Sequence, residues 1–223
     1  MVAPMGEKLR SRRPLKSREK PWAIALAHAL VRAGVAPNAV SLASVVFGAL
    51  AGGFLVASRD AGASERALLL VLAAIGIQLR LLCNLLDGMV AVEGGRGTKS
   101  GEVFNDAPDR VADVFVFVGA GYALPWPEWA SDLGWVAALL AVLTAYVRIL
   151  GGSLGLAQDF CGPMAKQHRM ALMTAACLLS VIEPWVSDRR GSVMTLALAL
   201  VIVGSAVTVG RRLWRIVRAL EAR

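Results

Sequence analysis

Two oxygen-bearing side chains share one face of a predicted helix with two very small residues. Asn84 and Asp87 are three residues apart, and Gly88 and Ala91 follow four and seven residues after Asn84. At the α-helical repeat these four positions lie on one face. That face is therefore a small-residue notch beside an amide and a carboxylate, which are groups that can bind a cation.

The next apolar segment carries a stripe of acidic and amide side chains. Asn105, Asp109 and Asp113 are spaced by four residues, and Glu102 and Asp106 fall within the same arc of a helix. A charged side chain at membrane depth costs roughly 2.5–3.5 kcal/mol on insertion scales unless something positive neutralises it. The two neighbouring segments therefore need either ion pairs or a bound cation.

Ion pairs are the simpler explanation, and Arg80, Arg110 and Arg148 are the arginines inside the predicted spans. The carboxylates of the two segments outnumber these arginines. Carboxylate and amide oxygens suit Mg²⁺ or Mn²⁺, which keep coordination positions open for phosphate oxygens. We therefore predict a divalent-cation site here rather than a polar seam without chemistry.

The run from Asn84 to Asp109 resembles the signature of the CDP-alcohol phosphotransferase family, which reads D-x2-D-G-x2-A-R-x8-G-x3-D-x3-D. Every gap of that pattern is matched. Identical residues stand at Asp87, Gly88, Ala91, Gly101 and Asp109. The predicted layout of the spans extends the similarity over most of the chain.

Three positions depart from that signature. Its first and third aspartates are Asn84 and Asn105, and its arginine is Val92. Each asparagine keeps a carbonyl ligand but loses a negative charge, so a two-metal site would be held less tightly. Glu102, Asp106 or Asp113 could restore that charge, and Arg96 or Lys99 could replace the arginine toward the donor's phosphates.

The resemblance implies a role for each matching residue. Metal would be held by Asn84, Asp87, Asn105 and Asp109. Asp109 would also be the general base toward the acceptor hydroxyl, with Asp113 as the alternative that geometry must decide. The nucleotide would be bound by Asn38, Ser41, Gly88, Ala91, Thr98 and Gly101.

Further basic residues are open to two interpretations. Arg148 lies in an apolar stretch and should face a cavity, where it binds an acceptor phosphate or pairs with Asp113. Lys166 and Arg169 belong to a short basic cluster before the fifth span. That cluster binds an anionic acceptor or anchors the chain to the membrane surface.

The composition supports an all-α membrane protein, because 57% of the 223 residues are hydrophobic and 18% are charged. We predict a basic segment over residues 1–20 and a single membrane-embedded domain over 21–223. Residues 21–31 form an interfacial amphipathic helix. Six transmembrane helices follow, at about 39–57, 67–92, 102–124, 134–155, 170–186 and 192–213.

The net charge of +8 gathers in the N-terminal segment, the C-terminal tail and two of the loops. This bias predicts a multi-pass protein of the cytoplasmic (inner) membrane, with both termini and the active site facing the cytoplasm. Anionic membrane lipids explain the basic N-terminus more simply than nucleic acid does.

The resemblance implies a homodimer that transfers a phosphatidyl or related group from a CDP-linked donor, such as CDP-diacylglycerol, to a polar alcohol and releases CMP. The sequence leaves the alcohol open. Two other hypotheses remain: a non-catalytic membrane protein that binds CDP-lipid or a cation in the same pocket, and a small transporter.

Overall fold

The computed structural model describes residues 16–95, 101–186 and 189–223, without the side chains of residues 16, 17, 102 and 105. Within those ranges the chain is helical. The helices are η1 (Lys16–Glu19), α2 (Pro21–Arg32), α3 (Pro37–Ala57), α4 (Ala63–Glu93), α5 (Gly101–Tyr122), α6 (Ala130–Ser153), α7 (Lys166–Ile182), η2 (Glu183–Trp185) and α8 (Ser192–Glu221). The boundaries agree with the predicted segments to within a few residues at most ends.

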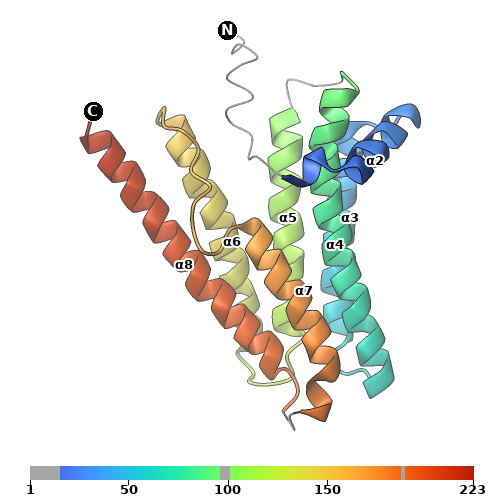
Figure 1. Ribbon diagram of the computed structural model, residues 1–223. Helices are drawn as coiled ribbons and strands as arrows, with labels where there is room; N and C mark the ends of the chain where they lie inside the picture. Colours follow the sequence, from blue (N-terminus) through green and yellow to red (C-terminus); the bar gives the residue numbers. More distant parts are fainter. Residues whose placement is uncertain (1–15, 96–100, 187–188) are drawn as a thin grey trace.

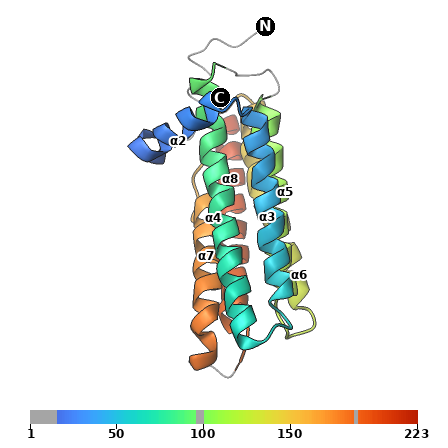
Figure 2. The same cartoon turned by 90° about the vertical axis from the view of Figure 1, so that its right-hand side faces the viewer.

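Six long helices run side by side, and α2 lies across one end of them (Figures 1 and 2). Helix α3 packs on α4 and α5, α6 packs on α5 and α8, and α7 packs on α4 and α8. Both α2 and α3 begin with a proline, whose missing N–H costs nothing in the first turn of a helix. The glycine at position 34 separates the two, with φ of +74°.

Close approach of α3 and α5 depends on glycine. A Cβ on Gly52 would lie 2.3 Å from the carbonyl oxygen of Phe115, and a Cβ on Gly48 would lie 2.9 Å from Cα of Ala112. Small residues let helix backbones approach in membranes, where packing rather than water exclusion drives association. This contact fixes how α5 is rotated, and therefore which way its acidic stripe points.

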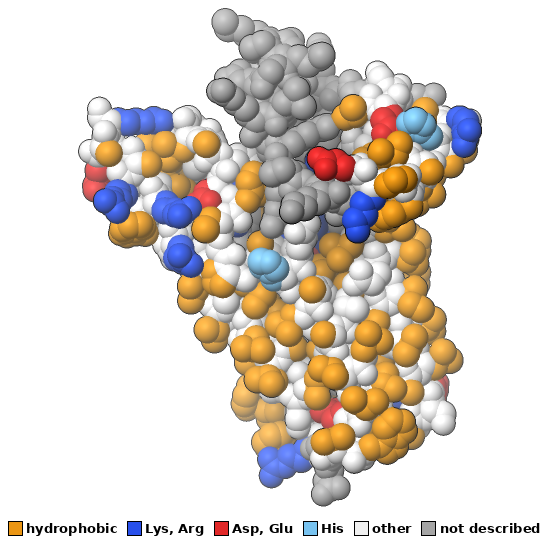
Figure 3. Space-filling model, viewed as in Figure 1, with side chains coloured by type: hydrophobic (Ala, Val, Ile, Leu, Met, Phe, Trp, Pro, Cys, Tyr) orange, Lys and Arg blue, Asp and Glu red, His pale blue; other side chains and the backbone are white. Residues whose placement is uncertain are grey.

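Four of the helices, α3, α4, α6 and α8, are long and apolar enough to cross a membrane. Helix α7 has 17 residues, and α5 carries charged side chains in its first half. Large apolar side chains such as Leu42, Leu139 and Leu196 are exposed on the body of the bundle, where Figure 3 shows hydrophobic surface. Such a surface would be unfavourable in water, and the chain is a helical membrane protein.

One boundary was predicted wrongly, and the error matters. The fifth span was expected to start near residue 170, with Lys166 and Arg169 in the loop before it. Helix α7 starts at Lys166, and Arg169 is almost fully buried. Both cations are therefore in the first turn of a bundle helix.

Candidate active site

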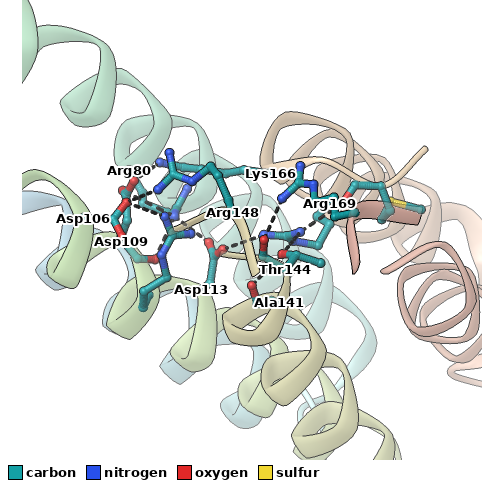
Figure 4. A network of polar contacts seen from close by, with 12 residues as sticks. Arg80, Asp106, Asp109, Asp113, Ala141, Thr144, Arg148, Lys166 and Arg169 are labelled. Atoms are coloured by element: carbon teal, nitrogen blue, oxygen red, sulfur yellow. Dashed lines mark hydrogen bonds and ion pairs between the residues drawn. The ribbon is translucent and has the colours of Figure 1, made fainter. Parts of the chain in front are cut away.

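Charged side chains from four helices meet inside the bundle (Figure 4). Helix α4 contributes one arginine, α5 three aspartates, α6 an arginine and a threonine, and α7 a lysine and an arginine. In chain order they are Arg80, Asp106, Asp109, Asp113, Thr144, Arg148, Lys166 and Arg169. We call these eight residues the polar cluster.

Asp113 lies at the centre of the polar cluster and is completely buried. Nη2 of Arg80 is 2.5 Å from its Oδ1, and Nη2 of Arg169 is 3.3 Å from its Oδ2. Arg169 also donates from Nη1 to the Thr144 hydroxyl at 3.1 Å and to the Met164 carbonyl at 3.0 Å. Asp113 thus holds α4, α5 and α7 together, which favours Asp109 over it as the candidate base.

The two carboxylate oxygens of Asp109 differ in their hydrogen bonding. Lys166 donates a hydrogen bond to Oδ2. Its Oδ1 is buried and has no hydrogen-bond partner among the described residues, although Nη2 of Arg80 lies 3.7 Å away. The same Arg80 nitrogen donates to the Asp109 carbonyl at 3.1 Å. The carboxylate is therefore held in place while one of its oxygens makes no hydrogen bond within the described residues.

Asp87 faces the same interior from α4. Its Oδ2 accepts a hydrogen bond from the Ser41 hydroxyl at 2.8 Å, and its Oδ1 accepts one from the Gly88 N–H at 2.5 Å. Asp87 and Asp109 are 4% and 6% exposed, so neither faces lipid. The two signature aspartates thus lie on the inside of neighbouring helices.

Asn84 and Asn38 complete the part of the predicted site that the structure describes. Nδ2 of Asn84 is buried and unpartnered within the described residues, and Asn38 is half-buried in the first turn of α3. Thr98 lies outside the described residues, as does the side chain of Asn105. Within the described ranges, no three His, Cys, Asp or Glu residues are grouped so as to hold a metal.

The notch on α4 is also present. Ala91 is half-buried. Gly101 is the first residue of α5, the helix that follows α4 in the chain. A Cβ on Gly88 would meet only Nη2 of Arg18, at 3.5 Å. The side chain of Val92 is 59% exposed. The space over Gly88 is therefore bounded by a cation from η1 rather than by a residue of α4.

The expectation that the carboxylates outnumber nearby cations is wrong for the described residues. Lys166 and Arg169 join from α7, and Asp106 accepts from Arg110 at 2.7 Å and from Arg148 at 2.6 Å. Asp106 and Asp113 are thus neutralised by arginine and are poorly placed to replace the charge lost at the two asparagines. Arg148 pairs with Asp106, not with Asp113.

A cavity of about 360 Å³ opens beside the polar cluster, between α6, the loop after it and α8. Three arginines line it, together with a glutamine and an aspartate: Arg148, Arg212, Arg215, Gln158 and Asp159. In the sequence, Arg212 and Arg215 counted only as part of the basic C-terminal tail that predicts a cytoplasmic C-terminus. Their spacing of three residues on one helix face was the signal that could have identified them.

The cavity remains strongly basic because its acidic group is already engaged. Burial disfavours the charge on Asp159, but hydrogen bonds from the Cys161 N–H and from Arg215 outweigh it and hold the pKa of Asp159 below its usual value. Arg212 donates to the carbonyls of Cys161 and Thr144, at 2.9 and 2.6 Å. The guanidinium of Arg148 lies over the Phe160 ring, 5.3 Å from its centroid.

No family model matches the chain, but individual proteins do. It is 32% identical over 165 residues to the phosphatidylinositol phosphate synthase of Mycobacteroides abscessus, covering 70% of this chain and 67% of that protein. It is 24% identical over 150 residues to the inner membrane protein YnbA of Escherichia coli, covering 67% of the chain and 70% of YnbA.

Solved structures share the fold. The Mycobacterium tuberculosis phosphatidylinositol phosphate synthase PgsA1, in complex with manganese and citrate, superposes with a TM-score of 0.71 at 19% identity, covering 87% of this chain and 88% of that one. The same protein with CDP-DAG bound gives 0.69 at 19% identity, with 87% and 92% covered. The bundle described above is therefore an architecture already seen in a phosphatidylinositol phosphate synthase.

Proposed function

Because the chain belongs to the CDP-alcohol phosphotransferase family, we propose that it transfers a phosphatidyl group from CDP-diacylglycerol to the hydroxyl of a polar alcohol and releases CMP. The observation that carries this proposal is that Asp87 and Asp109 are both buried inside the bundle, with one Asp109 oxygen that makes no hydrogen bond within the described residues. The phosphatidylinositol phosphate synthases among its relatives support the same reaction.

The acceptor in this proposal is a phosphorylated alcohol. Arg148, Arg212 and Arg215 line one cavity of about 360 Å³, and guanidinium groups bind phosphate bidentately. Arg148 also pairs with Asp106 of the polar cluster, so the cavity adjoins the candidate base. An anion held there would present a hydroxyl toward Asp109.

Asp109 removes the proton from that hydroxyl as its oxygen attacks the phosphorus that carries the diacylglycerol. The bond from this phosphorus to the bridging oxygen breaks, CMP leaves with the bonding electrons, and the proton ends on Asp109. Oδ1 is the atom that can receive it, because Oδ2 is engaged by Lys166.

The donor oxygens here fit a divalent cation, Mg²⁺ or Mn²⁺. Asp87, Asp109 and the Asn84 carbonyl would hold it, together with Asn105 from its place in the signature. Bound there, the ion would neutralise the pyrophosphate charge. The two asparagines and the Lys166 ammonium weaken such a site, so we expect chelation by EDTA to stop CMP release and millimolar Mg²⁺ or Mn²⁺ to restore it.

The remaining features belong to the same proposal. Helices α5 and α7 cross the membrane beside the four apolar helices, which gives six spans, and α2 lies at the interface with Trp22 half exposed. Residues 1–20 form a basic cytoplasmic segment, and 21–223 form one domain. Both termini and the site face the cytoplasm, since Figure 1 shows the C-terminus at the end of the bundle where α2 lies and α5 begins, and the protein is a homodimer.

A non-catalytic lipid-binding relative is the second candidate, and one observation favours it. Every described aspartate of the polar cluster is ion-paired, as expected for a site that only binds. In that case CDP-diacylglycerol would bind without turnover.

Purified protein in lipid nanodiscs separates the candidates. It is incubated with CDP-diacylglycerol, Mg²⁺ and, in turn, inositol phosphate, glycerol phosphate, inositol and serine, and CMP release is followed. The proposal predicts CMP with a phosphorylated alcohol and little with serine. If no alcohol gives CMP and CDP-diacylglycerol still binds, the non-catalytic candidate is favoured. If cations enter liposomes that contain the protein, and this flux survives Asp109→Ala, a transporter is favoured.

A further inference from the structure

A cation from the N-terminal segment reaches the notch on α4. Nη2 of Arg18 lies 3.5 Å from where a Cβ on Gly88 would be, which is ordinary van der Waals contact. Arg18 is half-buried, and its Nε is shielded from solvent. Its guanidinium therefore lies over the small face that Gly88 shares with Asn84 and Asp87.

The packing of α2 explains how Arg18 comes to be there. Ala23 and Ala27 of α2 are completely buried in a cluster that includes Leu86 and Val90 of α4. Because α2 is anchored along α4, the residues just before it are held at the end of α4, and η1 packs against that helix. Figure 1 shows this short segment, in dark blue, leading into α2 at the end of the bundle across which α2 lies.

Helix α4 supplies no cation of its own beside the notch. It has no Lys or Arg after Arg80, and the arginine of the family signature is replaced by Val92, whose side chain is largely exposed. The notch nevertheless sits where the proposed function needs a pyrophosphate. An arginine there can donate two parallel hydrogen bonds to phosphate oxygens and remains charged at every relevant pH.

We propose that Arg18 binds the phosphates of the CDP-linked donor and supplies, from the N-terminal segment, the positive charge that α4 lacks. This inference rests on the proposed function, because the CDP-linked donor is the substrate named there. Arg18 is a binding residue in this scheme, not an acid or base. Its loss therefore weakens donor binding more than it slows the chemical step.

Direct binding of labelled CDP-diacylglycerol to the full-length protein in nanodiscs tests the proposal. Arg18→Ala and Arg18→Gln are each expected to weaken binding on the order of tenfold, as for a hydrogen bond to a charged group, and Arg18→Lys to recover part of it. Lys20→Ala removes an exposed positive charge two residues away and should leave binding unchanged. In turnover assays the KM for the donor rises in Arg18→Gln while kcat stays within a few-fold.

Unchanged donor affinity in both Arg18→Ala and Arg18→Gln overturns the proposal. Tighter binding in either variant overturns it as well, because Arg18 would then be a plug that the donor displaces. A wild-type protein whose donor binding depends on Arg18 but which never releases CMP supports this inference and refutes the transferase. A wild-type protein that does not bind CDP-diacylglycerol refutes both.

Discussion

Two groups of buried charges lie at different levels of the bundle, and they are built differently. One includes Arg66 near the start of α4, and the other, the polar cluster, includes Arg80 further along the same helix. In the first group, Glu183 accepts hydrogen bonds from the Gly191 and Val193 N–H groups, at 2.9 and 2.8 Å. Arg66 donates to Glu183 at 3.3 Å and to the Ser180 carbonyl at 3.0 Å. This clip joins α4 and α7 to the start of α8.

The clip and the polar cluster differ in how far their hydrogen-bonding capacity is used. No buried side-chain nitrogen or oxygen of Arg66 or Glu183 is left without a partner. In the polar cluster and beside it, Nε and Nη1 of Arg80, Oδ1 of Asp109 and Nδ2 of Asn84 are buried and unpartnered within the described chain. Native proteins seldom leave such groups unsatisfied without a reason. The charged groups of the clip are fully hydrogen-bonded, although the Ser180 hydroxyl beside them has no partner among the described residues. The polar cluster, in contrast, leaves atoms of its charged groups without a partner there and so retains capacity for a ligand.

Asp109→Asn should give the largest effect. The amide keeps the shape of the side chain but cannot accept the hydroxyl proton, so CMP release is expected to fall by roughly 10²–10⁴-fold, as for loss of a general base. The thermal midpoint should change little, since Lys166 is partly exposed and can be hydrated. If turnover of Asp109→Asn stays within tenfold of wild type, Asp109 is not the general base, and Asp113 is the next residue to test.

Glu183→Ala should lower stability and leave turnover nearly unchanged, which is the opposite of Asp109→Asn. It leaves Arg66 and two backbone N–H groups unpaired in a buried place, and breaking a buried pair costs about 3–5 kcal/mol of unfolding free energy. Turnover per folded molecule, measured well below the thermal midpoint, should stay within a few-fold of wild type. If thermal stability is unaffected while CMP release is lost, the clip is not purely structural.

Arg215→Ala addresses the cavity. Its side chain is 50% exposed, so we expect a modest rise of about fivefold in the KM for a phosphorylated acceptor, and no change for the donor. Arg218→Ala is the matched control. Arg218 lies three residues after Arg215 on α8 and does not line the cavity. If the two variants raise the KM for the acceptor equally, the effect comes from general surface charge and not from binding in the cavity.

The smallest effect concerns pH. The pKa of Asp159 is lowered in the folded protein, so its stabilising contribution is present above the usual carboxyl pKa and is lost as the pH falls through the lowered value. Asp159→Asn should therefore be less stable than wild type by no more than about 1 kcal/mol at neutral pH. The difference should shrink below about pH 4, and thermal unfolding at several pH values would measure it. A difference that grows on acidification would contradict this assignment.

Much of the fold and part of the site were predictable from local patterns. Charge-free apolar stretches identified α3 and α8, and helical spacing correctly placed Asp87 and Asp109 inside neighbouring helices, since both are buried. The order of residues from Asn84 to Asp109 alone was enough to identify the family that the relatives support. These inferences need only the helical repeat and the cost of charge in an apolar stretch.

The partners of each carboxylate were decided by the tertiary structure. Lys166 and Arg169 were misplaced because a basic stretch before an apolar one can be either a loop or a first helical turn, and packing of α7 on α4 makes it the latter. Arg148, Arg212 and Arg215 meet at a cavity although they come from two helices. Charge pairing depends on how helices distant in the chain are rotated against one another, and no local periodicity encodes that rotation.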